Sequence, residues 1–245
     1  MINLLTRSST HLSSQDHNMI IRLLGQTDYL STWQRMQEFT QSRTPSQEDE
    51  IWLTEHPPVY TCGVRDSSEH IINKNNIPII QTDRGGLITY HGPGQLIIYP
   101  LLNLKNNKIK PTMIVTLLEN IVIQTLLHFN VIASANPKAR GVYTQSGGKI
   151  ASIGLRIKQH CSYHGMSFNV CMNLDPFSDI DPCGMTHQLM TDARSHIQPW
   201  DSAKFFDKFF QEFFKAFARD SNRLKITHEN KTQIPSKIWP GETFH

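Results

Sequence analysis

A cysteine in a turn is the first residue of this sequence with the chemistry of a nucleophile. Cys183 stands between a proline and a glycine in the segment DIDPCGM, residues 179–185. Cys161 and Cys171 stand instead in segments that read as strands, which is typical of core cysteines. A thiolate attacks carbonyl carbon once a nearby cation lowers the pKa of the thiol. Cys183 is therefore the candidate nucleophile.

A lysine at the start of an apolar strand is the candidate cation or base. Lys149 follows two glycines and begins an alternating run over residues 149–158. A lysine in this position either protects an exposed strand edge or serves as a buried functional amine. Position alone favours the edge, whereas burial would lower the pKa of the amine and make it a usable base.

A glycine-rich segment is the candidate binding loop. Residues 83–95 (DRGGLITYHGPGQ) combine two glycine motifs with the polar side chains of Arg84, Tyr90 and His91. Paired glycines permit a ligand to approach the backbone closely. The combination favours a ligand-binding loop over a bulged hairpin with a hydrogen-bonded histidine. The segment has no phosphate-loop pattern, so it does not imply a nucleotide.

A histidine and a glycine interrupt a later strand, SYHGMSFN, at residues 162–169. Gly165 would let a ligand lie against the strand. His164 by itself is more typical of a hydrogen-bonded structural histidine than of a base. Cys161 and His164 have the spacing of a zinc-ligand pair, but no second pair follows, so no metal site is expected.

Together these residues are the parts needed for covalent acyl transfer. They comprise a nucleophile, a cation or base, two histidines and a glycine-lined pocket. A cysteine–histidine hydrolase uses the same parts, and the pattern alone does not decide between the two reactions.

The elements that must position these residues follow from periodicity. Helical spacing predicts helices over 27–42, 112–129 and 202–219, the last with a phenylalanine stripe typical of core packing. Alternation and apolar runs predict strands over 50–56, 59–62, 77–82, 94–104 (interrupted at Pro100), 141–144, 149–158 and 162–174. This order predicts one α/β domain of α+β character with a mixed or antiparallel sheet, not a doubly wound fold.

Charge is distributed unevenly along the 245 residues, although the net charge is only +3. Residues 84–174 carry 9 basic side chains and one acidic side chain, whereas the flanking segments are slightly negative. This distribution predicts either an electropositive face for an anionic partner or scattered surface lysines, because position in the sequence is not position on the surface.

Composition excludes several classes of protein. With 38% hydrophobic and 18% charged residues, the chain is neither disordered nor a coiled coil. Its apolar runs are far shorter than the ~20 residues of a membrane-spanning helix. The N-terminus lacks the features of a secretory signal, and the four cysteines lack C-x-x-C spacing, so we expect a reducing, cytoplasmic location.

Four motifs in a fixed order resemble the octanoyltransferases of lipoate biosynthesis. They are RGGLITYHGPGQ (84–95), GGKIASIGLRI (147–157), HGMSFNV (164–170) and the turn Asp-Pro-Cys-Gly (181–184). The likeness covers residues 20–220. It leaves an unmatched N-terminal extension, 1–19, and a polar C-terminal tail, 221–245, which is expected to be poorly ordered or a surface arm. The resemblance implies the α/β fold of biotin/lipoate protein ligase catalytic domains.

The resemblance also implies a Cys/Lys pair at the active site. Cys183 would carry the octanoyl group as a thioester, and Lys149 would favour the thiolate or take the proton of the attacking amine. The residues that match the substrate-binding elements of the family are Arg84, Gly85, Gly86, Leu87, Ile88, Thr89, Tyr90, His91, Ser152, Ile153, Gly154, Gly165, Met166 and Ser167. No cofactor or metal is expected.

The partners implied by the resemblance are proteins. The donor would be octanoyl-acyl carrier protein, and the acceptors would be target lysines on the lipoyl domains of 2-oxoacid dehydrogenases and on the glycine-cleavage H protein. A cytoplasmic monomer that binds neither nucleic acid nor membrane is expected. Because acyl carrier proteins are acidic, docking contacts are expected among Lys138, Arg140, Arg156 and Lys158.

Three alternatives belong to other classes. An ATP-dependent lipoate or biotin protein ligase needs no cysteine nucleophile, and Cys183 shortly downstream of HGMSFNV argues against it. A non-catalytic acyl-binding or carrier-docking module is disfavoured because Cys183 and Lys149 are both present. A cysteine hydrolase would have to admit water to the acyl-enzyme, which a water-excluding pocket prevents.

Overall fold

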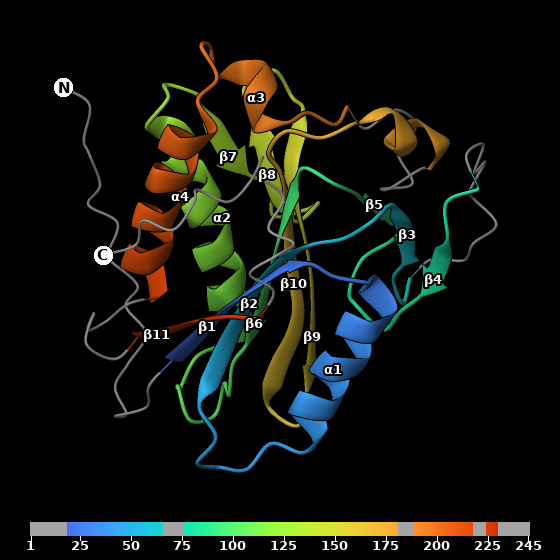
Figure 1. Cartoon of the computed structure of the whole chain (residues 1–245), viewed down its shortest axis with the longest axis vertical. Coiled ribbons are helices and arrows are strands. Elements are labelled where there is room, and N and C mark those ends of the chain that lie inside the picture. The colour runs from blue at the N-terminus through green and yellow to red at the C-terminus, as the bar shows by residue number, and fades with distance from the viewer. Residues whose placement is uncertain (1–18, 66–75, 181–188, 218–223, 230–245) are drawn as a thin grey trace.

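A mixed β-sheet with helices on both faces forms the body of the molecule (Figure 1). The computed structural model describes residues 19–65, 76–180, 189–217 and 224–229. The strands in these ranges are β1 (Met19–Gln26), β2 (Asp49–Glu55), β3 (Val59–Cys62), β4 (Ile79–Gln81), β5 (Thr89–His91), β6 (Gln95–Leu101), β7 (Ala133–Ala135), β8 (Gly141–Thr144), β9 (Lys149–Lys158), β10 (Cys161–Asn169) and β11 (Leu224–His228).

The strand order confirms the predicted mixed α/β architecture. In the described residues, eight strands form one sheet in the order β11-β1-β2-β6-β10-β9-β8-β7. β1 pairs in parallel with β11 and β2, whereas the remaining pairs of this sheet are antiparallel. A smaller sheet has the order β4-β3-β5 and leads into the glycine-rich segment. Two short helices, a 3₁₀ helix (Asp175–Asp179) and α3 (Ala193–His196), flank the undescribed segment 181–188.

The main core lies between the large sheet and two helices, α2 (Pro111–Leu127) and α4 (Ser202–Phe217). Both helices were predicted from periodicity. Pro111 occupies the first turn of α2, where a missing N–H costs no intrahelical hydrogen bond. The phenylalanine stripe of α4 is buried in this core, as predicted, with Phe205, Phe209 and Phe213 fully enclosed. No described helix is both long and apolar enough to cross a membrane.

The opposite face of the sheet carries α1 (Tyr29–Gln41), also predicted. Its N-cap is Asp28, whose carboxylate accepts a hydrogen bond from the backbone N–H of Ser31 at 2.9 Å. Met36 of α1 packs in a second apolar cluster against Trp52 of β2 and Tyr99 of β6. This face of the sheet also bears the candidate site.

Strand β6 runs through Pro100, which corrects the expected interruption. Pro100 lies opposite Ile51 on β2, whereas the ladder between β6 and β10 ends at the pair Ile98 and Met166. The position where proline has no N–H to donate therefore lies beyond that ladder. β10 also ends earlier than predicted, at Asn169, because the N–H groups of Val170 and Cys171 both donate to the carbonyl oxygen of Gly94.

Two strands at one edge of the sheet carry too weak a periodic signal to be predicted. β1 was missed, and β11 falls in the segment 221–245 that was expected to be a poorly ordered tail or a surface arm. For Leu224–His228 the expectation of disorder is wrong, because this short polar segment pairs along the whole of its length with β1. Its pairing, not apolar burial, holds it in place.

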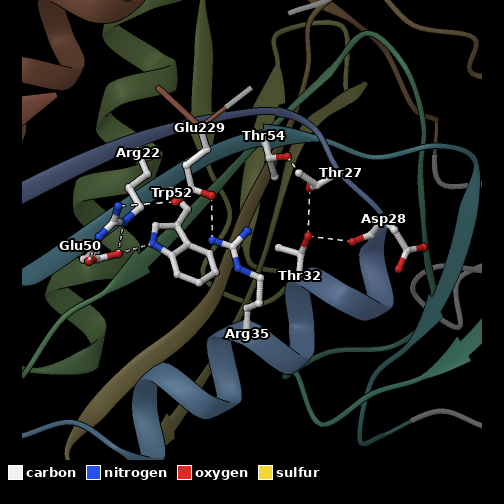
Figure 2. A network of polar contacts seen from close by, with 9 residues as sticks. All are labelled: Arg22, Thr27, Asp28, Thr32, Arg35, Glu50, Trp52, Thr54 and Glu229. Atoms are coloured by element: carbon white, nitrogen blue, oxygen red, sulfur yellow. Dashed lines mark hydrogen bonds and ion pairs between the residues drawn. The ribbon is translucent and has the colours of Figure 1, made fainter. Parts of the chain in front are cut away.

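An ion-pair network holds this edge of the sheet to α1 (Figure 2). Arg22 of β1 donates two hydrogen bonds to the carboxylate of Glu50, at 2.5 and 2.6 Å, and Trp52 donates a third at 2.6 Å. Just after β11, Glu229 accepts from Arg35 of α1 at 2.8 Å and lies 3.5 Å from Arg22. Glu229 therefore connects the C-terminal strand to both neighbouring elements.

Candidate active site

A cavity of about 470 Å³ opens beside β9, where the glycine-rich loop, β10, the start of α2 and residues 138–140 meet. Two pairs of directly opposed small residues form part of its floor: Ser152 with Ser167, and Gly154 with Gly165. Opposed residues of an antiparallel pair share one face of the sheet. The floor therefore lacks bulky side chains on the face that carries α1.

Most of the residues predicted to bind substrate line this cavity. They are Arg84, Gly85, Gly86, Leu87, Ile88, Thr89, His91, Ser152, Ile153, Gly154, Gly165, Met166 and Ser167, and Lys149 joins them. Tyr90 does not. It is the middle residue of β5 and packs on the other side against Tyr60 and Phe177, because neighbours along a strand face opposite sides.

Arg84 fixes the glycine-rich loop to the small sheet. Its guanidinium donates to the hydroxyl of Thr61 at 3.0 Å, to the carbonyl oxygen of the same residue, and to the carbonyl oxygen of Gly85 at 3.1 Å. The N–H of Gly85 in turn donates to the carbonyl oxygen of Leu155 on β9 at 3.3 Å. These bonds hold the loop over β9, so the buried Arg84 positions the cavity wall.

Gly154 must be glycine for the loop to lie where it does. A Cβ atom at this position would be 2.5 Å from the carbonyl oxygen of Gly85, a contact that real Cβ atoms do not make. The glycine predicted from the motif therefore permits two backbones to meet at the cavity.

Lys149 is a buried amine at the start of a central strand. β9 lies between β10 and β8, so Lys149 does not protect a sheet edge, and the edge interpretation is wrong. The side chain is enclosed, with the residue only 7% exposed. Its Nζ lies 5.4 Å from the ring centroid of Tyr143, and its Cε would be 2.9 Å from a Cβ on Gly141. Gly141 therefore provides the space that the lysine stem occupies.

Cys183 lies in the segment 181–188, outside the described residues. The residues on both sides of that segment are placed. Ile180 is buried, and Leu189–Thr191 pair with Lys149: the N–H of Lys149 donates to the carbonyl oxygen of Leu189 at 2.8 Å, and the N–H of Thr191 donates to that of Lys149 at 3.0 Å.

His91 takes part in a buried hydrogen-bond relay that ends beside Lys149. Its Nδ1 lies 2.7 Å from Oε1 of Gln95, whose amide donates to Asn169 at 2.9 Å. The amide of Asn169 then donates to the carbonyl oxygen of Thr191 at 2.9 Å. Burial lowers the pKa of His91 to about 3, so the ring is neutral at physiological pH. The relay therefore holds Thr191, shortly after the cysteine segment, in place.

Three further polar side chains near this wall were missed by the sequence reasoning. Nε2 of His56 lies 2.8 Å from the hydroxyl of Tyr99, and Tyr29 stacks on His91 at 5.6 Å between centroids. Tyr29 and Tyr99 line the cavity. Burial lowers the pKa of His56 to about 4 and raises that of Tyr29 to about 12, so both are uncharged. A histidine followed by two prolines at 56–58 was the one signal available.

His164 is a hydrogen-bonded structural histidine, as its type and position predicted. Its Nε2 lies 2.8 Å from Oδ1 of Asp83, which also accepts from Nε1 of Trp33 at 3.0 Å. The hydroxyl of Tyr163 donates to the other carboxylate oxygen. Although burial opposes ionisation, these hydrogen bonds hold the pKa of Asp83 well below its usual range. Desolvation lowers the pKa of His164.

The described lining of the cavity is strongly cationic. It contains five basic side chains and no carboxylate: Arg65, Arg84, Lys138, Arg140 and Lys149. Lys138 and Arg140, both predicted docking residues, lie at the rim, whereas Arg156 and Lys158 are exposed farther along β9. In the described ranges, no group of three potential metal-ligating side chains occurs. The site combines a buried amine, small floor residues and a positive rim.

Comparison with known sequences agrees with this chemistry. The model of the lipoyl protein ligase A/B catalytic domain matches residues 28–214. The chain is 46% identical over 187 residues to an octanoyltransferase of Vibrio vulnificus, covering 76% of this chain and 85% of that protein. It is 48% identical over 183 residues to an octanoyltransferase of Dichelobacter nodosus, covering 75% and 92%.

Solved structures share the fold at low sequence identity. A crystal structure of lipoate-protein ligase A bound with ATP aligns with a TM-score of 0.68 at 11% identity, over 87% of this chain and 88% of the other. A bipartite lipoate protein ligase from Thermoplasma acidophilum aligns with a TM-score of 0.67 at 14% identity, over 87% of each chain. The predicted ligase-like fold is confirmed.

The chain belongs to the lipoyl protein ligase A/B catalytic domain family. Relatives that share 46–51% sequence identity with it are octanoyltransferases, and like them it is an acyltransferase.

Proposed function

We propose that this chain moves an octanoyl group from octanoyl-acyl carrier protein to the target lysine of lipoyl domains, through a thioester on Cys183. Its relatives are octanoyltransferases, and octanoyl transfer in lipoate biosynthesis is the activity that its sequence motifs imply. The observation that carries the proposal is the hydrogen-bonded pairing of Lys149 with Leu189–Thr191, the segment that follows the cysteine turn. Because this pairing holds the first described residues after the cysteine turn against Lys149, it supports a site in which the two side chains act together.

In the first step, the Cys183 thiolate attacks the carbonyl carbon of the donor thioester. A new carbon–sulfur bond forms, the bond to the carrier sulfur breaks, and that sulfur leaves as a thiol with a proton from the Lys149 ammonium, which becomes an amine. Lys149 as an ammonium favours the thiolate, because an opposite charge close by stabilises the ionised form. One thioester replaces another, so the step is nearly balanced in free energy.

In the second step, the amino group of the acceptor lysine attacks the new thioester. Lys149 as an amine takes the proton of the attacking nitrogen, an amide forms, and the Cys183 sulfur leaves. Cys183 and Lys149 exchange protons with each other and therefore titrate as a coupled pair. Formation of an amide from a thioester is downhill, so the reaction needs no ATP.

The positive rim provides the contact for the donor. Acyl carrier proteins are acidic, and the described cavity lining bears no carboxylate. Lys138 and Arg140 are the docking residues nearest Lys149, with Arg156 and Lys158 on the exposed continuation of β9. The acceptors proposed are the lipoyl domains of 2-oxoacid dehydrogenases and the glycine-cleavage H protein. A monomer acting in the cytoplasm remains our prediction.

The experiment that tests the proposal is intact-protein mass spectrometry after mixing with octanoyl-acyl carrier protein. The wild type should gain one octanoyl group, about 126 Da for a cysteine thioester, and lose it when a lipoyl domain is added. Cys183→Ala should gain nothing. Cys171→Ala, at a partly exposed free cysteine, is the matched control and should acylate normally.

Two outcomes oppose the proposal. Acylation that persists in Cys183→Ala would remove the cysteine from the mechanism. Modification of the lipoyl domain only in the presence of ATP, with release of pyrophosphate, would assign the chain to the ligases.

A further inference from the structure

The backbone at His164 has an unusual conformation in the middle of a strand. Its φ is 55°, in the left-handed region that a residue with a Cβ rarely adopts. Side chains normally alternate between the two faces of a strand. At this point the alternation breaks, and the consecutive side chains Tyr163 and His164 both reach the carboxylate of Asp83.

The His164 ring is held from three directions. Asp83, the first residue of the glycine-rich loop, accepts at 2.8 Å from its Nε2. The same carboxylate is held by Trp33 of α1, whose ring lies 6.2 Å from that of His164. Tyr163 stacks on the histidine at 5.0 Å between centroids. The imidazole is therefore a rigid part of the cavity wall.

This arrangement carries two local costs. The left-handed conformation is one, and the other is Nδ1 of His164, which is buried with no hydrogen-bond partner among the described residues. Glycine, which has no Cβ, would avoid the strain of the left-handed backbone. An apolar ring would avoid the buried nitrogen without a hydrogen bond. Strain of this kind persists where function requires it.

His164 and Lys149 mark the two ends of one stretch of β9 that runs along the cavity. Both line it, and His164 pairs with Leu155, six positions along β9 from Lys149. At about 3.3 Å per residue, these ends are roughly 20 Å apart along the strand. The small floor residues Ser152, Gly154, Gly165 and Ser167 lie in between. We call this path, from Lys149 over the floor to the His164 ring, the acyl slot.

We propose that the His164 ring closes the far end of the acyl slot and limits the length of the acyl chain that the enzyme accepts. This inference rests on the proposed function, which places the acyl carbonyl at the Lys149 end. An extended eight-carbon chain spans roughly 9 Å if each bond advances about 1.2 Å, as in an extended backbone. The lysine stem covers part of the remaining path, because its Cε lies beside Gly141, which pairs with Ser152 three positions along β9.

The rigidity of the ring explains why it would discriminate between chains. A longer chain has to displace an imidazole that Asp83, Trp33 and Tyr163 hold in place, and packed interiors do not yield continuously. A loosely held side chain would swing aside and accept many lengths. His164 is thus a specificity-determining residue for acyl length, with Asp83 and Trp33 as its positioning residues.

The test compares acylation of Cys183 by hexanoyl-, octanoyl-, decanoyl- and dodecanoyl-acyl carrier protein. His164→Gly removes the ring and suits the left-handed backbone, so it opens the slot without adding strain. We expect its rate with decanoyl and dodecanoyl donors, relative to octanoyl, to rise at least tenfold above the wild-type ratio. Unchanged ratios in a folded His164→Gly variant would overturn the proposal.

His160→Gly is the matched control. His160 also has a positive φ, of 63°, but it is exposed in the turn between β9 and β10 and does not line the cavity. It should keep the wild-type chain-length profile. A shift as large in His160→Gly as in His164→Gly would mean that loosening of β10, not removal of the end wall, changes the selectivity, and would contradict the proposal.

His164→Asn keeps the test decisive if the glycine variant does not fold. Asparagine tolerates the left-handed region and is smaller than histidine, so an intermediate shift toward decanoyl is expected. Failure of this inference is distinct from failure of the proposed function. In the first case wild type and variants acylate with one common length profile, and in the second the wild type does not acylate at all.

Discussion

Lys149 and Leu189 form a backbone hydrogen bond of 2.8 Å across 40 residues of chain. The bond belongs to a parallel bridge between the start of β9 and the residues after the segment that contains Cys183. It anchors the end of that segment beside the buried amine. The relay from His91 through Gln95 and Asn169 to Thr191 supports the same short stretch from the other side.

Replacement of Lys149 by methionine should abolish transfer and leave the fold intact. Methionine has a similar length and no charge, so it fills the space beside Tyr143 and Gly141. Loss of a general base typically costs 10²–10⁴-fold in rate, and we expect single-turnover transfer to a lipoyl domain to fall by about that much. Lys204→Met, at an exposed lysine of α4, is the control. More than a tenth of the wild-type rate in Lys149→Met would exclude the base role.

Charge reversal at the rim should weaken recognition of the acyl carrier protein. For the double variant Lys138→Glu/Arg140→Glu, we expect kcat/KM with octanoyl-acyl carrier protein to fall about tenfold or more and to depend less steeply on salt, since both effects follow from lost electrostatic steering. The rate with a small octanoyl thioester should stay the same.

The control for that experiment lies across the sheet. Lys204→Glu/Lys215→Glu changes the net charge equally on α4, which covers the opposite face from α1. If both double variants lower kcat/KM to the same extent, net charge and not the rim is responsible.

Glu55 should make the protein less stable as the pH rises from about 4.5 to 7. Burial raises the pKa of its carboxyl from 4.5 to about 7, and the backbone N–H of Gly94 opposes this shift only in part. Between these values the native state holds a proton that the unfolded state has lost, so stability falls with rising pH, by up to about 3 kcal/mol, and is constant above 7.

Glu55→Gln should remove this pH dependence. The free energy of unfolding of the variant, relative to that of the wild type, should therefore increase from pH 4.5 to 7 and stay constant above 7. Urea unfolding at pH 5, 6, 7 and 8 measures it, with Glu38→Gln on exposed α1 surface as the control. A difference that does not vary with pH would show that Glu55 is ionised throughout.

Two glutamates of the network in Figure 2 should differ in their contribution to stability. Glu50 is buried and accepts two charge-assisted hydrogen bonds from Arg22 and one from the indole N–H of Trp52. Glu50→Gln should therefore cost about 2 kcal/mol of unfolding free energy. Glu229→Gln breaks solvent-accessible pairs and should cost less than about 1 kcal/mol. Equal values in urea unfolding would contradict this ranking.

Local pattern was sufficient for the elements that bury an apolar face. Helices α1, α2 and α4 and the strands β2, β3, β8, β9 and β10 have strong periodicity, and each was predicted near its observed place. β11 was not, because Lys225, Ile226 and His228 are exposed and the strand is selected by pairing with β1. Such pairing is a relation between distant segments, which no local window contains.

For the site, the sequence by itself determined the residue types: the glycines that let backbones meet, the lysine at the head of a strand and the loop that carries Arg84 and His91. Tertiary structure decided which of them face the cavity. It turned Tyr90 into the core and brought Asp83 to His164 across 81 residues. It also enclosed Lys149 inside a sheet, where sequence position had left both a strand edge and a buried amine open. Strand order, strand parity and a single left-handed residue set these outcomes, because each depends on partners that are distant along the chain.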